Sequence, residues 1–217
     1  MCQPFVIIKP EAFRFLKEIE TEIVGCGYLI DALYHIPSWG ALSSKIYKYD
    51  WDNNFSSPLD FLAHTWICNY FFGDNAILAL ISFRKTQNPA EIGFKVKKSF
   101  RRKYTKKMDF ITLTINLEKI RFINEGDLIL KENKEIDSFK FFNHNKMIPE
   151  SDFRRKTSFT HIHSPDPKIE ALTREWNLII DEKIICEENS ISGKAWTFMK
   201  KVNCISHPSE LERNEKS

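Results

Sequence analysis

The apolar residues at the start of the chain recur with the periods typical of strands and helices. The run FVIIK at residues 5–9 is β-branched and closes at Pro10, which predicts a short buried strand. Residues 11–27 place apolar side chains three and four positions apart and end in two glycines, as an amphipathic helix does. Residues 28–36, YLIDALYHI, predict a second strand.

The pattern then changes from one segment to the next. Residues 37–64 predict one or two short helices, because their apolar positions are interrupted by polar residues and proline. The aromatic run at residues 65–72 predicts a strand, and residues 75–84, NAILALISFR, predict a short helix after it.

A last strand at residues 158–163 and a helix from about residue 167 to 181 complete the series. Together with the earlier elements they make two interleaved β-α-β units. This order predicts an α/β (α+β) fold, with a ferredoxin-like βαββαβ antiparallel sheet and helices on its face.

An extra segment stands between the second of these units and its last strand. Residues 106–156 contain alternating runs such as FITLTINL and KIRFI, with a turn signal at NEGD, and predict an inserted β-ribbon. Residues 206–217 are polar and predict a disordered tail. We therefore expect one domain over residues 1–205, with the ribbon as an insertion.

Composition narrows the class of protein. A chain of 217 residues with 42% hydrophobic residues can bury one good core. No apolar run reaches the ~20 residues that cross a bilayer, and the N-terminus lacks a secretion signal, so we expect a soluble cytoplasmic protein. The five cysteines form no C-x-x-C pair and predict reduced thiols. A net charge of +3 does not by itself indicate nucleic acid.

Candidate chemistry begins with two histidines, His161 and His163, on the predicted last strand. For an arbitrary pair, a position on a surface strand is the more common explanation, and a spacing of two residues predicts that both side chains lie on one face of the strand. Five short motifs along the chain favour a functional role instead. In chain order they are FVIIKPEAF, FFGDNAI, RKTQNPAE, SFRRKY and HIHSPD. In this order they resemble the nucleoside diphosphate kinase family, over roughly residues 4–105 and 157–182. The resemblance implies that SFRRKY, residues 99–104, forms a loop.

The resemblance implies roles for several residues. His163 is the implied nucleophile, which takes a γ-phosphoryl group from a nucleoside triphosphate and passes it to a nucleoside diphosphate. Lys9, Arg84 and Arg101 occupy the family's three positive positions, where cations stabilise the transferred group. Glu175 matches the glutamate that orients the histidine, with a spacing one residue longer than usual, and a solvent-facing glutamate is the alternative.

Nucleotide binding is implied for a second set of residues. Tyr47 and Phe55 are spaced like an active-site tyrosine and a base-stacking phenylalanine. Tyr49 is an alternative for the tyrosine, and core filling explains these aromatic residues equally well. Gln87 stands where the family has a threonine, and Thr160 stands where it has an asparagine. We expect Mg²⁺ to arrive with ATP or another triphosphate, held mainly by the phosphates.

Two departures leave a second class of function open. Pro165 stiffens the turn behind His163, and Thr160 offers a hydroxyl in place of an amide, so the chain could be a nucleotide-binding sensor with weakened catalysis. Nucleic-acid binding through KVKKSFRRKYTKK is the weaker third alternative. The ribbon beside the expected site favours a homodimer over a hexamer.

Overall fold

The computed structural model describes residues 2–54, 73–104, 110–115, 119–124, 134–137, 153–158 and 161–203. These residues form a mixed α/β structure around an antiparallel four-stranded sheet with the strand order β2-β3-β1-β8. Its strands are β1 (Phe5–Ile8), β2 (Ile30–Ile36), β3 (Ala76–Ile81) and β8 (Ile162–His163). Every neighbouring pair in this sheet is antiparallel.

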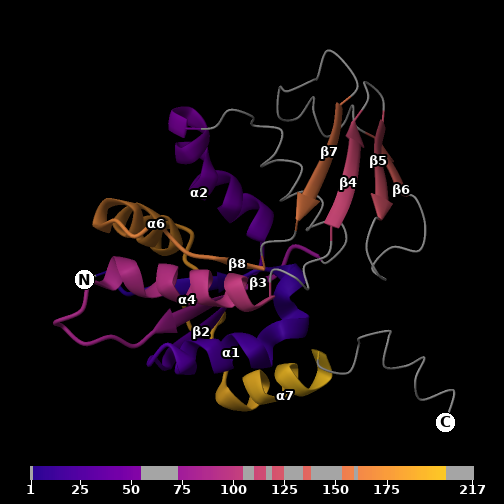
Figure 1. Ribbon diagram of the computed structural model, residues 1–217. Helices are drawn as coiled ribbons and strands as arrows, with labels where there is room; N and C mark the ends of the chain where they lie inside the picture. The colour runs from indigo at the N-terminus through magenta and orange to yellow at the C-terminus, as the bar shows by residue number, and fades with distance from the viewer. Residues whose placement is uncertain are drawn as a thin grey trace, which may run out of the picture.

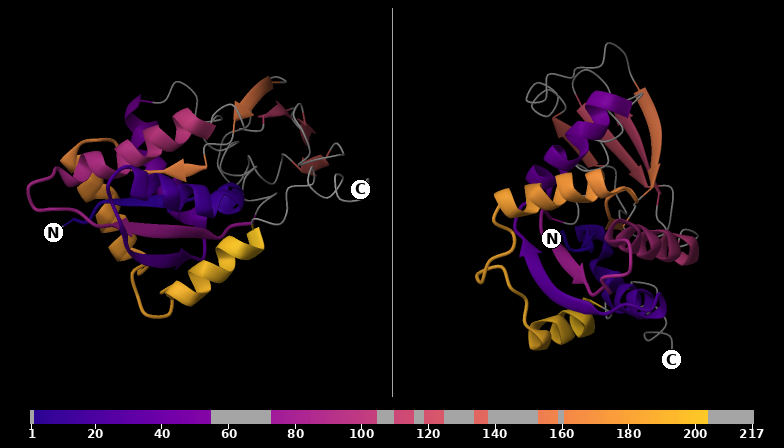
Figure 2. Two further views of the ribbon diagram at one scale, coloured as in Figure 1. Left: turned by 60° about the horizontal axis from the view of Figure 1, so that its bottom comes forward. Right: turned by 90° about the vertical axis from the view of Figure 1, so that its left-hand side faces the viewer.

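Helices cover both faces of this sheet. The described helices are η1 (Pro10–Phe15), α1 (Leu16–Gly25), α2 (Trp39–Asn54), α4 (Pro89–Tyr104), α6 (Ile169–Asp181) and α7 (Gly193–Asn203). Figure 1 shows α2 and α6 above the sheet and α1 and α7 below it, and Figure 2 shows the layers from two other sides.

Alternation along the strands produces these two layers. Val6 and Ile8 of β1 pack in the core with α1, α4 and Trp196 of α7. Phe5 and Ile7 pack in the opposite core with residues of α2 and α6. Because successive side chains of a strand point to opposite faces, a strand buried on both faces is apolar at every position.

This burial explains one error of sequence interpretation. The segment predicted as a helix at residues 75–84 contains β3, whose six residues Ala76–Ile81 are all buried. A short continuous apolar run does not distinguish a doubly buried strand from a buried helix. The motif GDNAI therefore leads into a sheet strand, and SFRRKY, expected as a loop, lies within α4.

Several other predicted strands and helices agree with the structure. The strands at residues 5–9 and 28–36, the first helix and the last helix are confirmed by β1, β2, α1 and α6. The segment from residue 37 begins with the single long helix α2. The strand predicted at residues 65–72 and the tail at 206–217 lie outside the described residues.

The inserted segment forms a second antiparallel sheet. Its strand order is β6-β5-β4-β7, and its strands are β4 (Phe110–Ile115), β5 (Lys119–Asn124), β6 (Lys134–Asp137) and β7 (Phe153–Ser158). The predicted runs FITLTINL and KIRFI contain β4 and β5, and β7 and β6 pair with them on either side. Residues 153–158 pair with β4, so only residues 162–163 of the predicted last strand join the first sheet. Figure 1 shows the second sheet set apart from the first.

Candidate active site around His163

His163 lies in β8, the strand at one edge of the first sheet. Antiparallel pairing sets Ile7 opposite His163, and directly paired residues point their side chains to the same face. Ile7 packs with α2 and α6, so the imidazole also faces those helices. The side chain is buried, with an exposed fraction of 7% for the residue.

Both ring nitrogens of His163 have a polar partner. Nε2 lies 2.7 Å from Oε2 of Glu175 on α6, and Nδ1 lies 3.0 Å from the hydroxyl oxygen of Tyr47 on α2. Glu175 belongs to the buried stripe of α6, which also contains Leu172 and Ile179. The apolar face of this helix therefore carries one carboxylate against the sheet, and that carboxylate meets the histidine.

These contacts define the protonation state that suits the site. A carboxylate accepts hydrogen bonds only, so Nε2–H donates to Glu175 and the lone pair of Nδ1 accepts from the Tyr47 hydroxyl. Burial lowers the pKa of His163, and the charges of Lys97 and Lys9 lower it further, although Glu175 raises it. The imidazole is thus neutral at neutral pH, with a lone pair on Nδ1.

Asp74, two residues before β3, caps the N-terminus of α2. Its carboxylate accepts hydrogen bonds from the Ser38 hydroxyl at 2.7 Å and from the Gly40 main-chain nitrogen at 2.5 Å. This capping positions Trp39, whose ring centroid lies 6.1 Å from that of His163. It also sets the start of the helix that carries Tyr47 to the imidazole.

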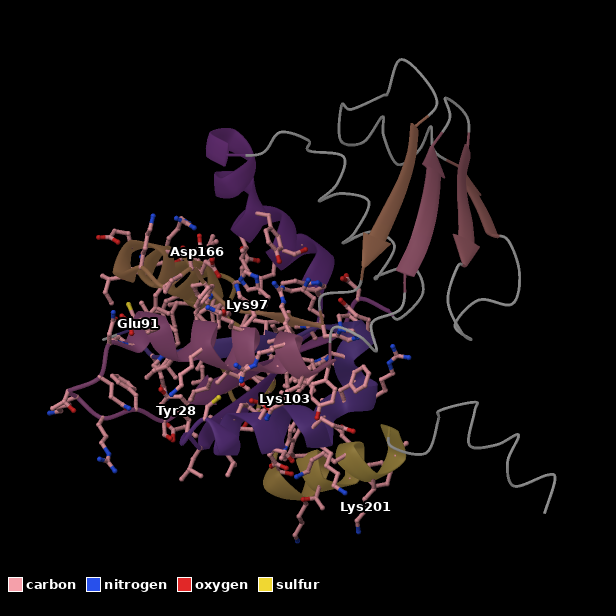
Figure 3. The ribbon with its side chains drawn as sticks, viewed as in Figure 1. Tyr28, Glu91, Lys97, Lys103, Asp166 and Lys201 are labelled. Atoms are coloured by element: carbon pink, nitrogen blue, oxygen red, sulfur yellow. The ribbon has the colours of Figure 1, made fainter. Side chains whose placement is uncertain are left out.

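Two cations of α4 reach the strand that carries His163. Arg101 donates from Nη2 to the carbonyl oxygen of Ile162 at 3.3 Å. Lys97 donates from Nζ to the carbonyl oxygen of Ser164 at 2.8 Å. In Figure 3, Lys97 lies on the side of α4 toward α6, whereas Lys103 lies on the side toward α1.

Lys9 adds a third positive charge from the end of β1. Its main-chain nitrogen donates to the carbonyl oxygen of His161 at 3.0 Å. Its side chain is buried, and Nζ lies 5.9 Å from the ring centroid of Trp39. The charges of Lys9 and Lys97 therefore act on the buried imidazole, and Arg101 binds the carbonyl of the residue before it.

Arg84 does not join this cluster. His163 stands opposite Ile7, which in turn pairs with Leu78, so Ile81 already lies about 10 Å along β3 from the level of His163. Arg84 follows in an exposed loop, where its main-chain nitrogen donates to Oε1 of Gln87 at 2.8 Å. The resemblance assigned Arg84 to the site, but β3 carries it to the other end of the sheet from His163.

Gln87 lies in the same loop as Arg84 and is likewise away from the imidazole. It lines an open hollow of about 670 Å³ together with Asn88, Pro167 and residues on the outer face of α4. Two further predicted contacts, Phe55 and Thr160, lie outside the described residues.

His161 has a different environment from the surface strand position that its spacing predicts. It is buried, and its ring lies 5.0 Å from that of Phe15 and 6.3 Å from that of Phe100, centroid to centroid. Its φ of +55° lies in the left-handed region, which breaks the extended chain immediately before β8. His161 therefore packs in the core with α4, on the side of the sheet away from His163.

No cluster of three or more His, Cys, Asp or Glu side chains suited to a metal ion occurs among the described residues. The donor set around His163 is cationic and aromatic, with one carboxylate already bonded to the imidazole. Such a set offers few of the oxygen ligands that Mg²⁺ prefers.

Comparisons of the chain with protein-family models, with curated proteins and with solved structures find no match. None of the described helices has the length and apolar character needed to cross a membrane.

Sequence reasoning missed two residues of this cluster, Lys97 and Trp39. The signal for Lys97 was its position four residues before Arg101, which places two side chains on one face of a helix. In a loop, a spacing of four residues does not place two side chains on one face. The expected loop at residues 99–104 therefore concealed this signal. Trp39 carried no comparable signal, because its position depends on the capping of α2.

Proposed function

We propose that this chain is a phosphotransferase resembling nucleoside diphosphate kinases, which moves the γ-phosphoryl group of a nucleoside triphosphate to a nucleoside diphosphate through phospho-His163. One observation carries the proposal: a buried, neutral imidazole bonded through Nε2 to Glu175 lies among three cations. A neutral nitrogen nucleophile and fixed positive charge are the two requirements of phosphoryl transfer through histidine.

The reaction has two balanced steps. The lone pair of Nδ1 forms a bond to the γ-phosphorus, and the bond from that phosphorus to the β,γ-bridging oxygen breaks, so the diphosphate leaves with the electron pair. A β-phosphate oxygen of the acceptor diphosphate then attacks the same phosphorus. The N–P bond breaks, and its electron pair returns to Nδ1.

Named residues have separate tasks in these steps. Glu175 accepts from Nε2–H and stabilises the positive charge that develops on the ring as the N–P bond forms. Lys9 and Arg101 offset the negative charge spread over the phosphoryl oxygens. The Tyr47 hydroxyl occupies the lone pair of Nδ1 in the free protein, so it has to give way to phosphorus or turn toward a phosphoryl oxygen.

The arrangement of the first sheet supports the same proposal. Its order, β2-β3-β1-β8 with antiparallel neighbours, is the order that two interleaved β-α-β units produce in a ferredoxin-like fold. A Mg²⁺–nucleotide complex is the proposed substrate, in which the phosphates hold the metal ion. We further propose that the protein acts as a homodimer.

A nucleotide-binding sensor is the second candidate, and the position of Arg84 favours it. The resemblance assigns Arg84 to the transferred phosphate, but Arg84 lies in a loop away from the site. Tyr47 is bonded to Nδ1, the nitrogen that would attack. Both features would suit nucleotide binding without transfer. The two candidates differ in whether a covalent intermediate forms.

The test is to incubate the protein with γ-labelled ATP and Mg²⁺ and to examine the label on the protein. Phosphohistidine is labile in acid and stable in alkali. We expect such a label in the wild type, and its loss in His163→Ala with nucleotide binding retained, because binding depends mainly on cations and stacking.

His35→Ala, a histidine of β2, is the matched control and should keep the label. A label that persists in His163→Ala would contradict the mechanism, and a wild type that takes none from any triphosphate would support the sensor.

A further inference from the structure

Lys97 and Arg101 act on the same short segment of chain. They stand four residues apart on α4, so their side chains leave the same face of the helix. They bind the carbonyl oxygens of Ser164 and Ile162, which are the residues on either side of His163. Carbonyl groups two residues apart point to the same side of an extended chain, so the two cations flank the nucleophile from one side.

Lys97 has more N–H donors than the one that binds the Ser164 carbonyl. An ammonium group has three N–H donors, and the Ser164 carbonyl accepts one of them. The remaining donors can bind oxygen atoms of an anion brought to the imidazole. The charge of Lys97 also acts on the imidazole, because it lowers the pKa of His163.

We propose that Lys97 is a phosphate-binding residue of the His163 site, and that it supplies the third positive charge that the sequence assigned to Arg84. The proposal deepens the proposed function and rests on it, because a transferred phosphoryl group is the anion that comes to His163. Arg84 lies in the exposed loop after β3, whereas Lys97 binds the carbonyl oxygen of Ser164, the residue after the nucleophile. The helix α4 would then carry two of the three cations.

Lysine in place of arginine makes the site sensitive to pH. Burial lowers the pKa of Lys97 to about 8, and the charges of Arg101 and Lys9 also lower it. Asp166, in the loop after β8, and Glu175 raise it. Above about pH 8 the ammonium loses its proton and with it the charge that binds an anion. Affinity for phosphate should therefore fall as the pH rises, by up to tenfold per pH unit.

The experiment measures binding of inorganic pyrophosphate by calorimetry at pH 7 and pH 9, so that it needs neither a nucleoside nor turnover. We expect Lys97→Met to weaken binding about tenfold or more at pH 7, the usual effect of losing a hydrogen bond to a charged group. Lys97→Arg should bind as the wild type does at pH 7 and more tightly than the wild type at pH 9. Titration of pyrophosphate itself is common to all variants and cancels in their ratios.

Lys98→Met is the matched control, since Lys98 is the next residue of α4, is exposed and carries the same charge. It should reduce affinity by less than about threefold at either pH, through long-range charge alone. Equal losses in Lys97→Met and Lys98→Met would overturn the proposal. So would identical pH dependence in the wild type and Lys97→Arg, because a purely structural lysine has no reason to titrate with the ligand.

The same samples separate this proposal from the function on which it rests. If pyrophosphate binding depends on Lys97 but no phosphohistidine forms from any triphosphate, the transferase proposal fails and the anion site remains. If phosphohistidine forms and the Lys97→Met variant binds pyrophosphate as the wild type does, the transferase stands and Lys97 has no part in phosphate binding.

Discussion

At the scale of single residues, the surroundings of His163 matter more than the presence of a histidine. The same chain carries His161 two positions earlier, packed among Phe15 and Phe100 and facing the other side of the sheet. His163 instead meets a carboxylate and a phenol. Two imidazoles of equal intrinsic basicity are therefore assigned different tasks by the face on which each lies.

Glu175→Gln should slow formation of phospho-His163 about 10- to 100-fold, the usual cost of losing a partner that orients a histidine. Glutamine keeps the shape of the side chain, but it lacks the charge that stabilises the ring as the N–P bond forms. The loss of that charge should also lower the pKa of His163 further, because Glu175 raises it in the wild type.

Single-turnover labelling would measure this rate, with nucleotide affinity measured on the same samples. Glu170→Gln is the control, since Glu170 lies exposed in the first turn of α6. A rate in Glu175→Gln equal to that of the control would show that the carboxylate does not act on the imidazole.

At the scale of elements, the site depends on how closely α4 approaches the sheet. Gly93 faces β1 and β8, and a Cβ atom there would meet the carbonyl oxygen of Phe5 far inside van der Waals contact, with Ser164 Cβ at 3.3 Å. Only glycine lets the helix lie this close. This approach brings Lys97, one turn later, within hydrogen-bonding distance of the Ser164 carbonyl.

We expect Gly93→Ala to lower the free energy of unfolding by about 1–3 kcal/mol, the range for overpacked cores, because the colliding atom belongs to the backbone and cannot rotate away. Gly25→Ala is the control: nothing lies within 4 Å of a Cβ at that position, the last residue of α1. Alanine there should leave stability unchanged or raise it slightly.

Urea denaturation followed by circular dichroism would compare the two variants. Equal midpoints for Gly93→Ala and Gly25→Ala would mean that α4 can move outward without cost. In that case the close approach would not be what positions Lys97.

At the scale of the whole molecule, one edge of the first sheet is covered by the chain itself. The main-chain nitrogen of His35 in β2 donates to Asn189, and that of Ile191 donates to Leu33 of β2, at 2.7 Å and 2.9 Å. This covering segment leads into α7, where the Trp196 Nε1–H donates to Glu20 of α1. The bond holds α7 beside α1. A covered edge does not offer its hydrogen-bonding groups to a second sheet.

We expect light scattering to give a mass near twice the 25.6 kDa of the chain, with the two copies joined through a surface other than the β2 edge. The reason is that the inserted sheet, close in sequence to α4, takes space that higher assemblies would need. A mass near six chains would contradict this expectation, and a mass of one chain would show that the protein acts alone.

Sequence alone predicted the elements whose patterns are distinctive. The amphipathic stripe before Gly25 and the helix carrying Glu175 required only periodicity, and both helices are present. The resemblance also directed attention to His163, Lys9 and Arg101, which the structure brings to one place. For these three residues the order of the motifs along the chain was sufficient, although the structure places Arg101 in a helix where a loop was expected.

Tertiary structure decided what depends on two-sided burial and on pairing between distant segments. Residues 76–81 are apolar at every position, and only the helices on both faces make them a strand. That strand carries Arg84 away from the site, while the close packing of α4 brings Lys97 to it. Sequence determined which charges the chain carries, but side-chain position follows from packing between layers, so the structure decided which of them surround His163.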